Sequence, residues 1–144
     1  MSIFGNNLYE IMKERNITPK QLIELAGVDK NVIYDADKHE PLLVNAIKIA
    51  DALNVSLDYL VGKEVAENIY IEKDYKINFY DNLDKELKNQ GISKRKFCRD
   101  LKYSLASFTR WKNGELPYFQ TIIEISTYLN CSIDILVGRC GNNH

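Results

Sequence analysis

The chain has 144 residues and a formal net charge of −1, with 45% hydrophobic and 27% charged residues. These fractions are typical of a folded globular protein and not of a disordered one. The 7 glycines and 3 prolines are too few for a collagen-like chain or for Gly/Pro-rich low-complexity sequence. No apolar run approaches the roughly 18 residues of a membrane span, and no basic segment followed by an apolar core opens the chain. We therefore expect a cytoplasmic protein that does not bind membranes.

The residues that usually carry catalysis or bind metals are sparse and scattered. The three cysteines, Cys98, Cys131 and Cys140, form no C-x-x-C pair, which argues against a disulfide framework and a zinc site. His39 and His144 have no partner suggesting metal or catalysis, and no glycine-rich phosphate loop or nucleophile motif is present. We expect a protein that is not an enzyme, with no metal, no cofactor and no small-molecule ligand.

An internal repeat organises the chain. The segment 54–62, Asn-Val-Ser-Leu-Asp-Tyr-Leu-Val-Gly, returns at 130–138 as Asn-Cys-Ser-Ile-Asp-Ile-Leu-Val-Gly, at an offset of 76 residues. Further upstream the offset is 75, so the second copy has gained one residue, which we place near Asn113-Gly114. Two copies are too few for a solenoid. The repeat predicts two tandem small domains, residues 1–62 and 77–144, joined by a linker at 63–76.

The first copy divides into five predicted short helices. Thr18 caps the second helix, Gly27 ends it, and Asp29 caps the third. Asn54 ends the fourth helix and Ser56 caps the fifth, whereas the residues before Leu8 are expected to fray. The side chains expected to face the core are Leu8, Ile11 and Met12; Leu22, Leu25 and Ala26; Val32, Ile33 and Ala36; Ala46, Ile47, Ile49, Ala50 and Leu53; and Leu57, Leu60 and Val61.

The second copy follows the same plan. Gly91 ends its first predicted helix, while Ser93, Ser104 and Ser132 cap the second, third and fifth. The residues after Gly138 are expected to fray. The side chains expected to face the core are Leu83 and Leu87; Phe97, Cys98 and Leu101; Phe108 and Trp111; and Ile122, Ile123, Ile125, Ser126 and Leu129.

Both copies resemble the Cro-like phage-repressor helix-turn-helix family, also called xenobiotic-response-element-like. The resemblance is carried in the first copy by residues 18–29 and 49–62, and in the second by residues 93–97, 103–104, 111–114 and 129–138. It implies an all-α fold of two tandem five-helix lambda-repressor-like DNA-binding domains. It also implies a sequence-specific, repressor-type transcriptional regulator of bacterial or phage origin that binds double-stranded DNA, usually as a homodimer.

The resemblance places the third helix of each copy in the major groove. There, an arginine can pair with guanine, and an apolar side chain can contact the thymine methyl group. The implied DNA-binding positions of the second copy are Ser104, Leu105, Ala106, Ser107, Thr109 and Arg110, of which the two serines would contact phosphate. In the first copy the candidates are Lys20, Lys30, Asn31 and Tyr34, and Asp35 stands where the second copy has Arg110.

Charge is unevenly divided between the copies. Residues 1–72 hold seven basic and twelve acidic side chains, a net charge of −5, and the remaining residues carry +4. Residues 91–112 contain seven basic residues and only one acid, and Lys94, Arg95 and Lys96 form the first turn of the second predicted helix of that copy. Such a basic stretch at helix-turn-helix positions favours contact with phosphates, so we expect the second copy to be the main reader of DNA. Whether the first copy also binds DNA, or instead dimerises or binds protein, stays open.

Two geometries and one other function are compatible with these patterns. The tandem copies could act as a pseudo-dimer within one chain. Alternatively, the chain could self-associate so that two basic copies meet a palindrome, with half-sites about 34 Å apart. The alternative function is a protein-interaction module, such as an antitoxin-like or anti-defence helix-turn-helix protein with reduced DNA binding.

Overall fold

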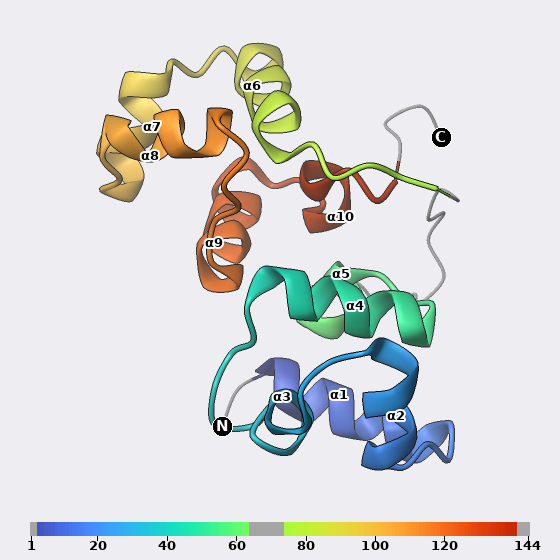
Figure 1. Ribbon diagram of the computed structural model, residues 1–144. Coiled ribbons are helices and arrows are strands. Elements are labelled where there is room, and N and C mark those ends of the chain that lie inside the picture. Colours follow the sequence, from blue (N-terminus) through green and yellow to red (C-terminus); the bar gives the residue numbers. More distant parts are fainter. Residues whose placement is uncertain (1–2, 64–73, 141–144) are drawn as a thin grey trace. The chain divides into compact units, whose positions relative to one another are not determined.

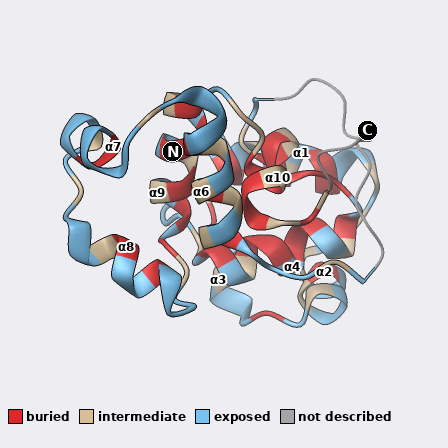
Figure 2. Ribbon diagram, turned by 90° about the horizontal axis from the view of Figure 1, so that it is seen from above, coloured by how far each residue is buried: buried red, intermediate tan, exposed pale blue. Residues whose placement is uncertain are grey.

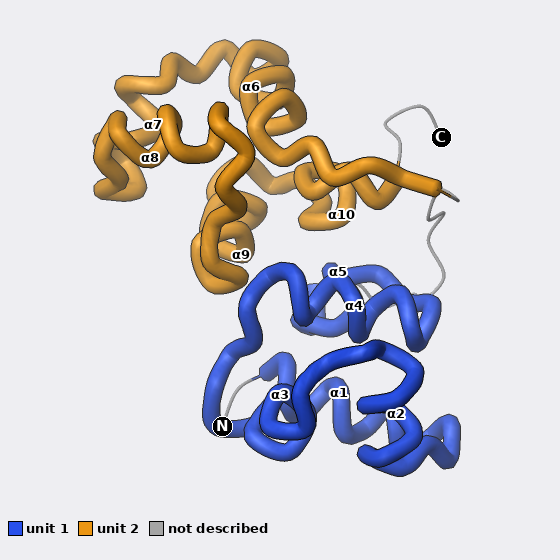
Figure 3. The backbone as a smooth tube through the Cα atoms, in the orientation of Figure 1, with its two compact units in different colours: residues 1–69 blue, residues 70–144 orange. Residues whose placement is uncertain are grey.

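The computed structural model describes residues 3–63 and 74–140, and over these ranges the chain is all-α, with ten helices and no strand (Figure 1). The all-α prediction is therefore confirmed for the described part of the chain. The chain divides into two compact units, Met1–Ile69 and Tyr70–His144 (Figure 3). Residues 64–73 of the predicted linker lie outside the described residues. No described helix combines the length and the apolar character needed to cross a bilayer.

The first unit contains five of these helices: α1 (Ile3–Glu14), α2 (Pro19–Ala26), α3 (Lys30–Tyr34), α4 (Leu43–Leu53) and α5 (Leu57–Leu60). Helix α2 packs against α3 and α4, and α5 packs against α1 and α4. The predicted caps of this unit are confirmed. Thr18 and Gln21 form a reciprocal capping box, the Asp29 carboxylate accepts from the Asn31 N–H at 3.0 Å, and Gly27 has a left-handed φ of 69°.

The second unit contains α6 (Phe79–Gln90), α7 (Lys94–Leu101), α8 (Leu105–Lys112), α9 (Phe119–Leu129) and α10 (Ile133–Val137). Helix α6 packs against α8 and α10, α7 packs against α8, and α9 packs against α10. Gly91 ends α6 with a φ of 68°, and the Ser93 and Ser132 hydroxyls cap α7 and α10 as predicted.

Aromatic side chains anchor α8 in this unit. The rings of Phe108 and Trp111 are buried, and Phe108 lies edge-on to Phe97 of α7 with centroids 5.5 Å apart. Trp111 meets Phe79 of α6 edge-on at 5.4 Å. Edge-to-face pairs of this kind add to the stabilisation from burial. Because Phe108 and Trp111 are three residues apart, they hold one face of α8 inward and leave the opposite face outward.

Both ends of the described chain are better ordered than the sequence predicts. Helix α1 begins at Ile3 rather than near Leu8, and Phe4 is buried. At the other end, Arg139 is fully buried instead of fraying, because its guanidinium forms an ion pair with the buried carboxylate of Asp134 at 2.5 Å. Side-chain packing thus extends beyond the repeated motif at each end.

The predicted core is largely confirmed, with one clear error. Leu25 is 64% exposed, because the core-facing side of α2 consists of the buried Leu22 with the half-buried Ile23 and Ala26, and Leu25 lies to one side of it. The other residues predicted to be buried that are only half-buried are Ala26, Val32, Val61, Leu101 and Ile123.

Candidate functional site

Helices α7 and α8 form the helix pair on which the sequence analysis places the site. They are joined by residues 102–104, and Lys102 ends α7 with a left-handed φ of 63°. A residue with a Cβ is strained in this conformation, which is why glycine is common there. Most residues of the two helices are exposed, apart from the buried rings and the Cys98 thiol that face the core (Figure 2).

The outer face of α8 presents the predicted base-facing residues together. Leu105 is 57% exposed, and Ala106, Thr109 and Arg110 are also exposed. They share this face because Phe108 and Trp111 occupy the opposite one. Of the two serines assigned to phosphate, Ser104 directly precedes α8 and is exposed, and Ser107 lies in its first turn and is half-buried.

Ser104 does not cap α8 as predicted. Its backbone is extended, as at an N-cap, but its hydroxyl makes no capping hydrogen bond. The Ser104 Oγ instead lies 3.4 Å from the Ser107 Oγ, and the Arg110 Nη2 donates to the Ser107 Oγ at 3.3 Å. The guanidinium of Arg110 also pairs with Glu115, with its Nε 3.0 Å from the Oε2. A line of polar contacts therefore replaces the cap along the outer edge of α8.

Lys94 is more deeply involved in its own unit than its sequence position suggests. Its ammonium group donates to the Tyr80 hydroxyl at 2.7 Å, lies 3.7 Å from the Asp84 carboxylate and stands 5.7 Å from the Phe108 ring centroid. The hydrogen bond to Tyr80 and the charge of Asp84 raise the pKa of Lys94. Lys94 thus ties α7 to α6 as well as carrying charge.

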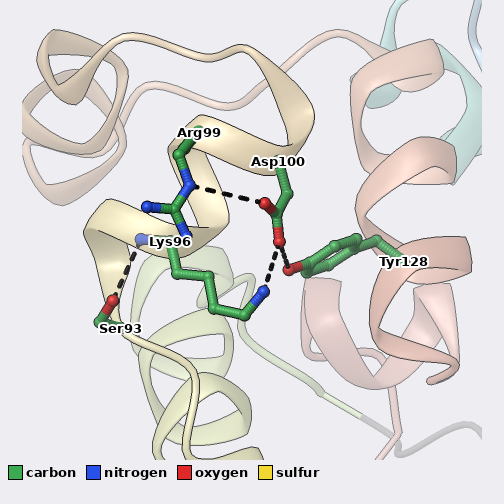
Figure 4. A network of polar contacts seen from close by, with 5 residues as sticks. All are labelled: Ser93, Lys96, Arg99, Asp100 and Tyr128. Carbon is green, nitrogen blue, oxygen red and sulfur yellow. Dashed lines mark hydrogen bonds and ion pairs between the residues drawn. The ribbon is translucent and has the colours of Figure 1, made fainter.

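Asp100, the one acid of the basic stretch, contacts two hydrogen-bond donors and a further cation (Figure 4). Its carboxylate accepts from the Lys96 ammonium at 2.8 Å and from the Tyr128 hydroxyl at 2.6 Å, and lies 3.9 Å from the Arg99 Nε. The hydrogen bonds from Lys96 and Tyr128, together with the positive charges of Lys96 and Arg99, lower the pKa of Asp100. The hydrogen bond to Asp100 and its negative charge raise the pKa of Lys96. The side chains of Lys96 and Arg99 remain 51% and 70% exposed, so both can still reach an anion.

Arg95, Lys102 and Lys112 are exposed and have no ion pair among the described residues. Arg95 lies in the first turn of α7, Lys102 in the turn, and Lys112 at the end of α8. No ion pair between the described residues therefore has to break before these three cations can contact phosphate. Lys102 and Lys112 were outside the predicted site, although both belong to the basic stretch that marked it.

The corresponding elements of the first unit are smaller and more acidic. Helix α3 has five residues against eight in α8. Lys20 on α2 and Lys30, Asn31 and Tyr34 on α3 are all exposed, so the predicted side chains are accessible. Acids flank them, however, since Asp29 precedes Lys30 and Asp35 follows Tyr34. The Asp29 carboxylate is directed at the Asn31 N–H, and Asp35 is half-buried.

The carboxylates that pair with the basic side chains are the part of the site that sequence reasoning missed. Asp84, Asp100 and Glu115 each contact a predicted site residue. Of these contacts, the pair Lys96 and Asp100 has the i, i+4 spacing at which ion pairs form on helices, so the sequence could have predicted this pair. The Asp84 and Glu115 contacts cross from one element to another and leave no such pattern. No group of three or more His, Cys, Asp or Glu in the described ranges is placed to hold a metal ion.

Comparison with known proteins agrees with this geometry. Residues 82–138, which run from α6 to the end of α10, match the family of Cro/C1-type HTH DNA-binding domains and form such a domain. The chain is also similar to the uncharacterized HTH-type transcriptional regulator YqaE of Bacillus subtilis (strain 168), with 27% identity over 77 residues. That similarity covers 52% of this chain and 66% of the relative. No solved structure matches the chain.

Proposed function

We propose that this protein is a sequence-specific DNA-binding transcriptional regulator of repressor type, and that its second unit makes most of the contacts with DNA. The observation that carries the proposal is the exposed surface of α7, α8 and the turn between them, where Arg95, Lys102 and Lys112 have no carboxylate partner within residues 3–63 and 74–140. The Cro/C1-type match over 82–138 supports it, as does the name of the Bacillus relative.

In the proposed complex, α8 enters the major groove and its outer face meets the base edges. Arg110 pairs with the O6 and N7 of a guanine, while Leu105 and Ala106 contact thymine methyl groups. Arg95 and Lys112, near the two ends of the helix pair, bind phosphates on either side of the groove, and Ser104 and Ser107 add hydrogen bonds. The cations displaced from the DNA make this binding depend steeply on salt.

We also propose the tandem arrangement, with a five-helix domain in each unit joined near residues 63–76. In this arrangement the first unit serves mainly in self-association. A homodimer would then bring two second units to a palindrome whose half-sites lie about 34 Å apart. The short α3 and the acids around it support this division of labour. Sedimentation of the chain with and without a palindromic duplex tests this proposal. If the homodimer forms, two chains should bind each duplex.

The test of DNA binding is a charge-neutralising variant of the full chain, Arg95→Gln with Lys112→Gln. Each phosphate contact adds about one unit to the slope of log affinity against log salt, so the slope for random duplex should fall by about two. The matched control is Lys48→Gln with Lys85→Gln, which removes the same charge from exposed positions on α4 and α6. The control should keep the full slope.

A specific observation favours a second candidate, the protein-interaction module. Residues 1–72 carry a net charge of −5, which suits a basic partner better than DNA. An unaltered chain that shows no salt-dependent binding to duplex DNA at low ionic strength would overturn the regulator and leave the interaction module.

A further inference from the structure

We propose that Glu115 determines specificity by holding the Arg110 guanidinium in position to select guanine at one base position. Glu115 lies outside the helix pair, in the loop that follows α8, and is therefore a positioning residue. The inference rests on the proposed function, since it concerns how the same surface discriminates among DNA sequences.

The backbone of the loop places Glu115 beside Arg110. Gly114 has a φ of +100°, and its N–H donates to the Trp111 carbonyl at 3.0 Å. The Glu115 N–H then donates back to the carbonyl of Arg110 itself at 3.0 Å. Because Trp111 is buried, this turn is attached to the core of the unit. Glu115 thus has a defined main-chain position relative to the arginine it contacts.

Two side chains hold the guanidinium. Its Nε lies 3.0 Å from the Glu115 Oε2, and its Nη2 donates to the Ser107 Oγ at 3.3 Å. A guanidinium carries five N–H donors, so three remain, two on Nη1 and one on Nη2. Those two nitrogens form the end that pairs with the O6 and N7 of guanine. The Arg110 side chain is still 57% exposed, so this end remains accessible to DNA.

An Arg110 side chain that is fixed before binding favours discrimination between DNA sequences over general attraction to phosphates. A long side chain that is already held loses less rotamer freedom on binding, so more of the guanine interaction appears as affinity for the correct site. At the same time the Glu115 charge offsets that of Arg110 and weakens its attraction to any phosphate. The pair is weak in water, but it strengthens where a docked duplex excludes solvent.

The first unit lacks this pair, which fits its different role. Where the second unit has Arg110, the repeat places Asp35 in the first unit. A carboxylate at this position cannot be the arginine of such a clamp. The positioning device therefore belongs only to the unit that we propose as the main reader.

The test is a double-mutant cycle on the full chain. A site selected from a random DNA pool, and its variants with single guanines replaced, give a discrimination ratio for each base. Glu115→Gln should lower the ratio about tenfold at the base recognised by Arg110 and slightly raise affinity for random duplex. In the Arg110→Ala background, Glu115→Gln should leave the ratio unchanged. Glu10→Gln, an exposed acid on α1, is the matched control.

The outcomes separate this inference from the proposed function. An unchanged ratio in Glu115→Gln, or an equal fall in the Arg110→Ala background, overturns the role of Glu115 while DNA binding stands. An unaltered chain that binds no duplex at low salt overturns the proposed function and the inference with it. NMR relaxation of the Arg110 Nε–H in the free chain measures the mobility of the guanidinium and so tests the clamp without DNA. The group should be rigid in the unaltered chain and mobile in Glu115→Gln, and equal mobility in both overturns the clamp.

Discussion

Arg139 and Asp134 form the one ion pair between fully buried side chains in the described residues, with side-chain exposures of 1% and 0%. The Arg139 guanidinium also stands 5.9 Å from the centre of the Tyr75 ring. The main chain repeats the link, because the Arg139 N–H donates to the Asp134 carbonyl at 2.8 Å. Charges taken this far from water are tolerated only when each is paired. The pair therefore fastens the chain after Gly138 to α10.

Removing one member of this pair should be costly. We expect Arg139→Met to lower the free energy of unfolding by about 3–5 kcal/mol, because it leaves the Asp134 carboxylate buried beside an apolar side chain. Chemical denaturation followed by circular dichroism measures this loss. The double variant Arg139→Met with Asp134→Asn should recover part of it, since the stranded charge is gone. If the double variant were as unstable as the single one, the burial of an unpaired charge would not be the cause.

At the scale of a helix, the two serines before α7 and α8 differ although the sequence predicts the same role for both. The Ser93 Oγ accepts from the Lys96 N–H at 3.0 Å, whereas the Ser104 Oγ makes no such bond. Ser104 lies instead at the end of the polar line through Ser107 to Arg110. Local pattern alone does not distinguish the two, because both serines have the extended backbone of an N-cap.

Alanine substitutions should reveal this difference. We expect Ser93→Ala to lower the free energy of unfolding by about 1 kcal/mol, the typical contribution of a capping hydroxyl. Ser104→Ala should cost less than half of that, because no cap is lost. Thermal melts of both variants in one buffer provide the measurement. Equal losses would mean that Ser104 caps α8 in solution.

The contact between α7 and α9 should depend on pH. Asp100 has a pKa lowered from 3.8 by its hydrogen bonds to Lys96 and Tyr128. A lowered pKa in the folded chain means that the carboxylate stabilises the fold above its unfolded pKa and ceases to do so as the pH falls through the folded value.

The variant Asp100→Asn isolates this contribution. The stability difference between the unaltered chain and Asp100→Asn should be largest near neutral pH and should shrink below about pH 4. Denaturation midpoints of both chains over pH 3 to 7 provide the comparison, and Glu24→Gln, at an exposed acid on α2, serves as control. If the stability difference between the two chains stayed constant over this pH range, the ionised Asp100 carboxylate would not be its cause.

At the scale of the whole molecule, the two units differ in net charge and in the length of their third helix, which is α3 in the first unit and α8 in the second. The basic stretch 91–112 belongs to the second unit, and the five-residue α3 with its flanking acids belongs to the first. Long-range electrostatic attraction to a duplex follows such a distribution and not the overall charge of −1.

This division predicts unequal effects of equal charge changes. The variant Lys20→Gln with Lys30→Gln should leave affinity for random duplex within about twofold of the unaltered chain, because the first unit makes few phosphate contacts in the proposed complex. The second-unit variant Arg95→Gln with Lys112→Gln should lose far more. Fluorescence anisotropy with a labelled duplex at one low salt concentration compares the two. Equal losses would show that both units contact DNA.

Much of the fold could be predicted from the sequence because the signals are local. Thr18 with Gln21, Gly27, Asp29, Asn54 and Gly91 mark helix limits through hydrogen bonds or backbone angles within a few residues. The three-residue spacing of Phe108 and Trp111 likewise predicts which face of α8 is outward. Leu25 was placed wrongly because the direction of the buried face of α2 depends on its neighbours α3 and α4.

The sequence by itself determined most of the helix limits and which residues carry positive charge, since capping and helical periodicity depend on nearby residues. Only the tertiary structure decided which of those charges are already paired. The contacts of Lys94 with α6, of Asp100 with Tyr128 and of Arg110 with Glu115 join separate elements through space. The burial of Arg139 has the same origin. Electrostatic partners are set by distance in the folded chain, and helix packing and loop path determine that distance.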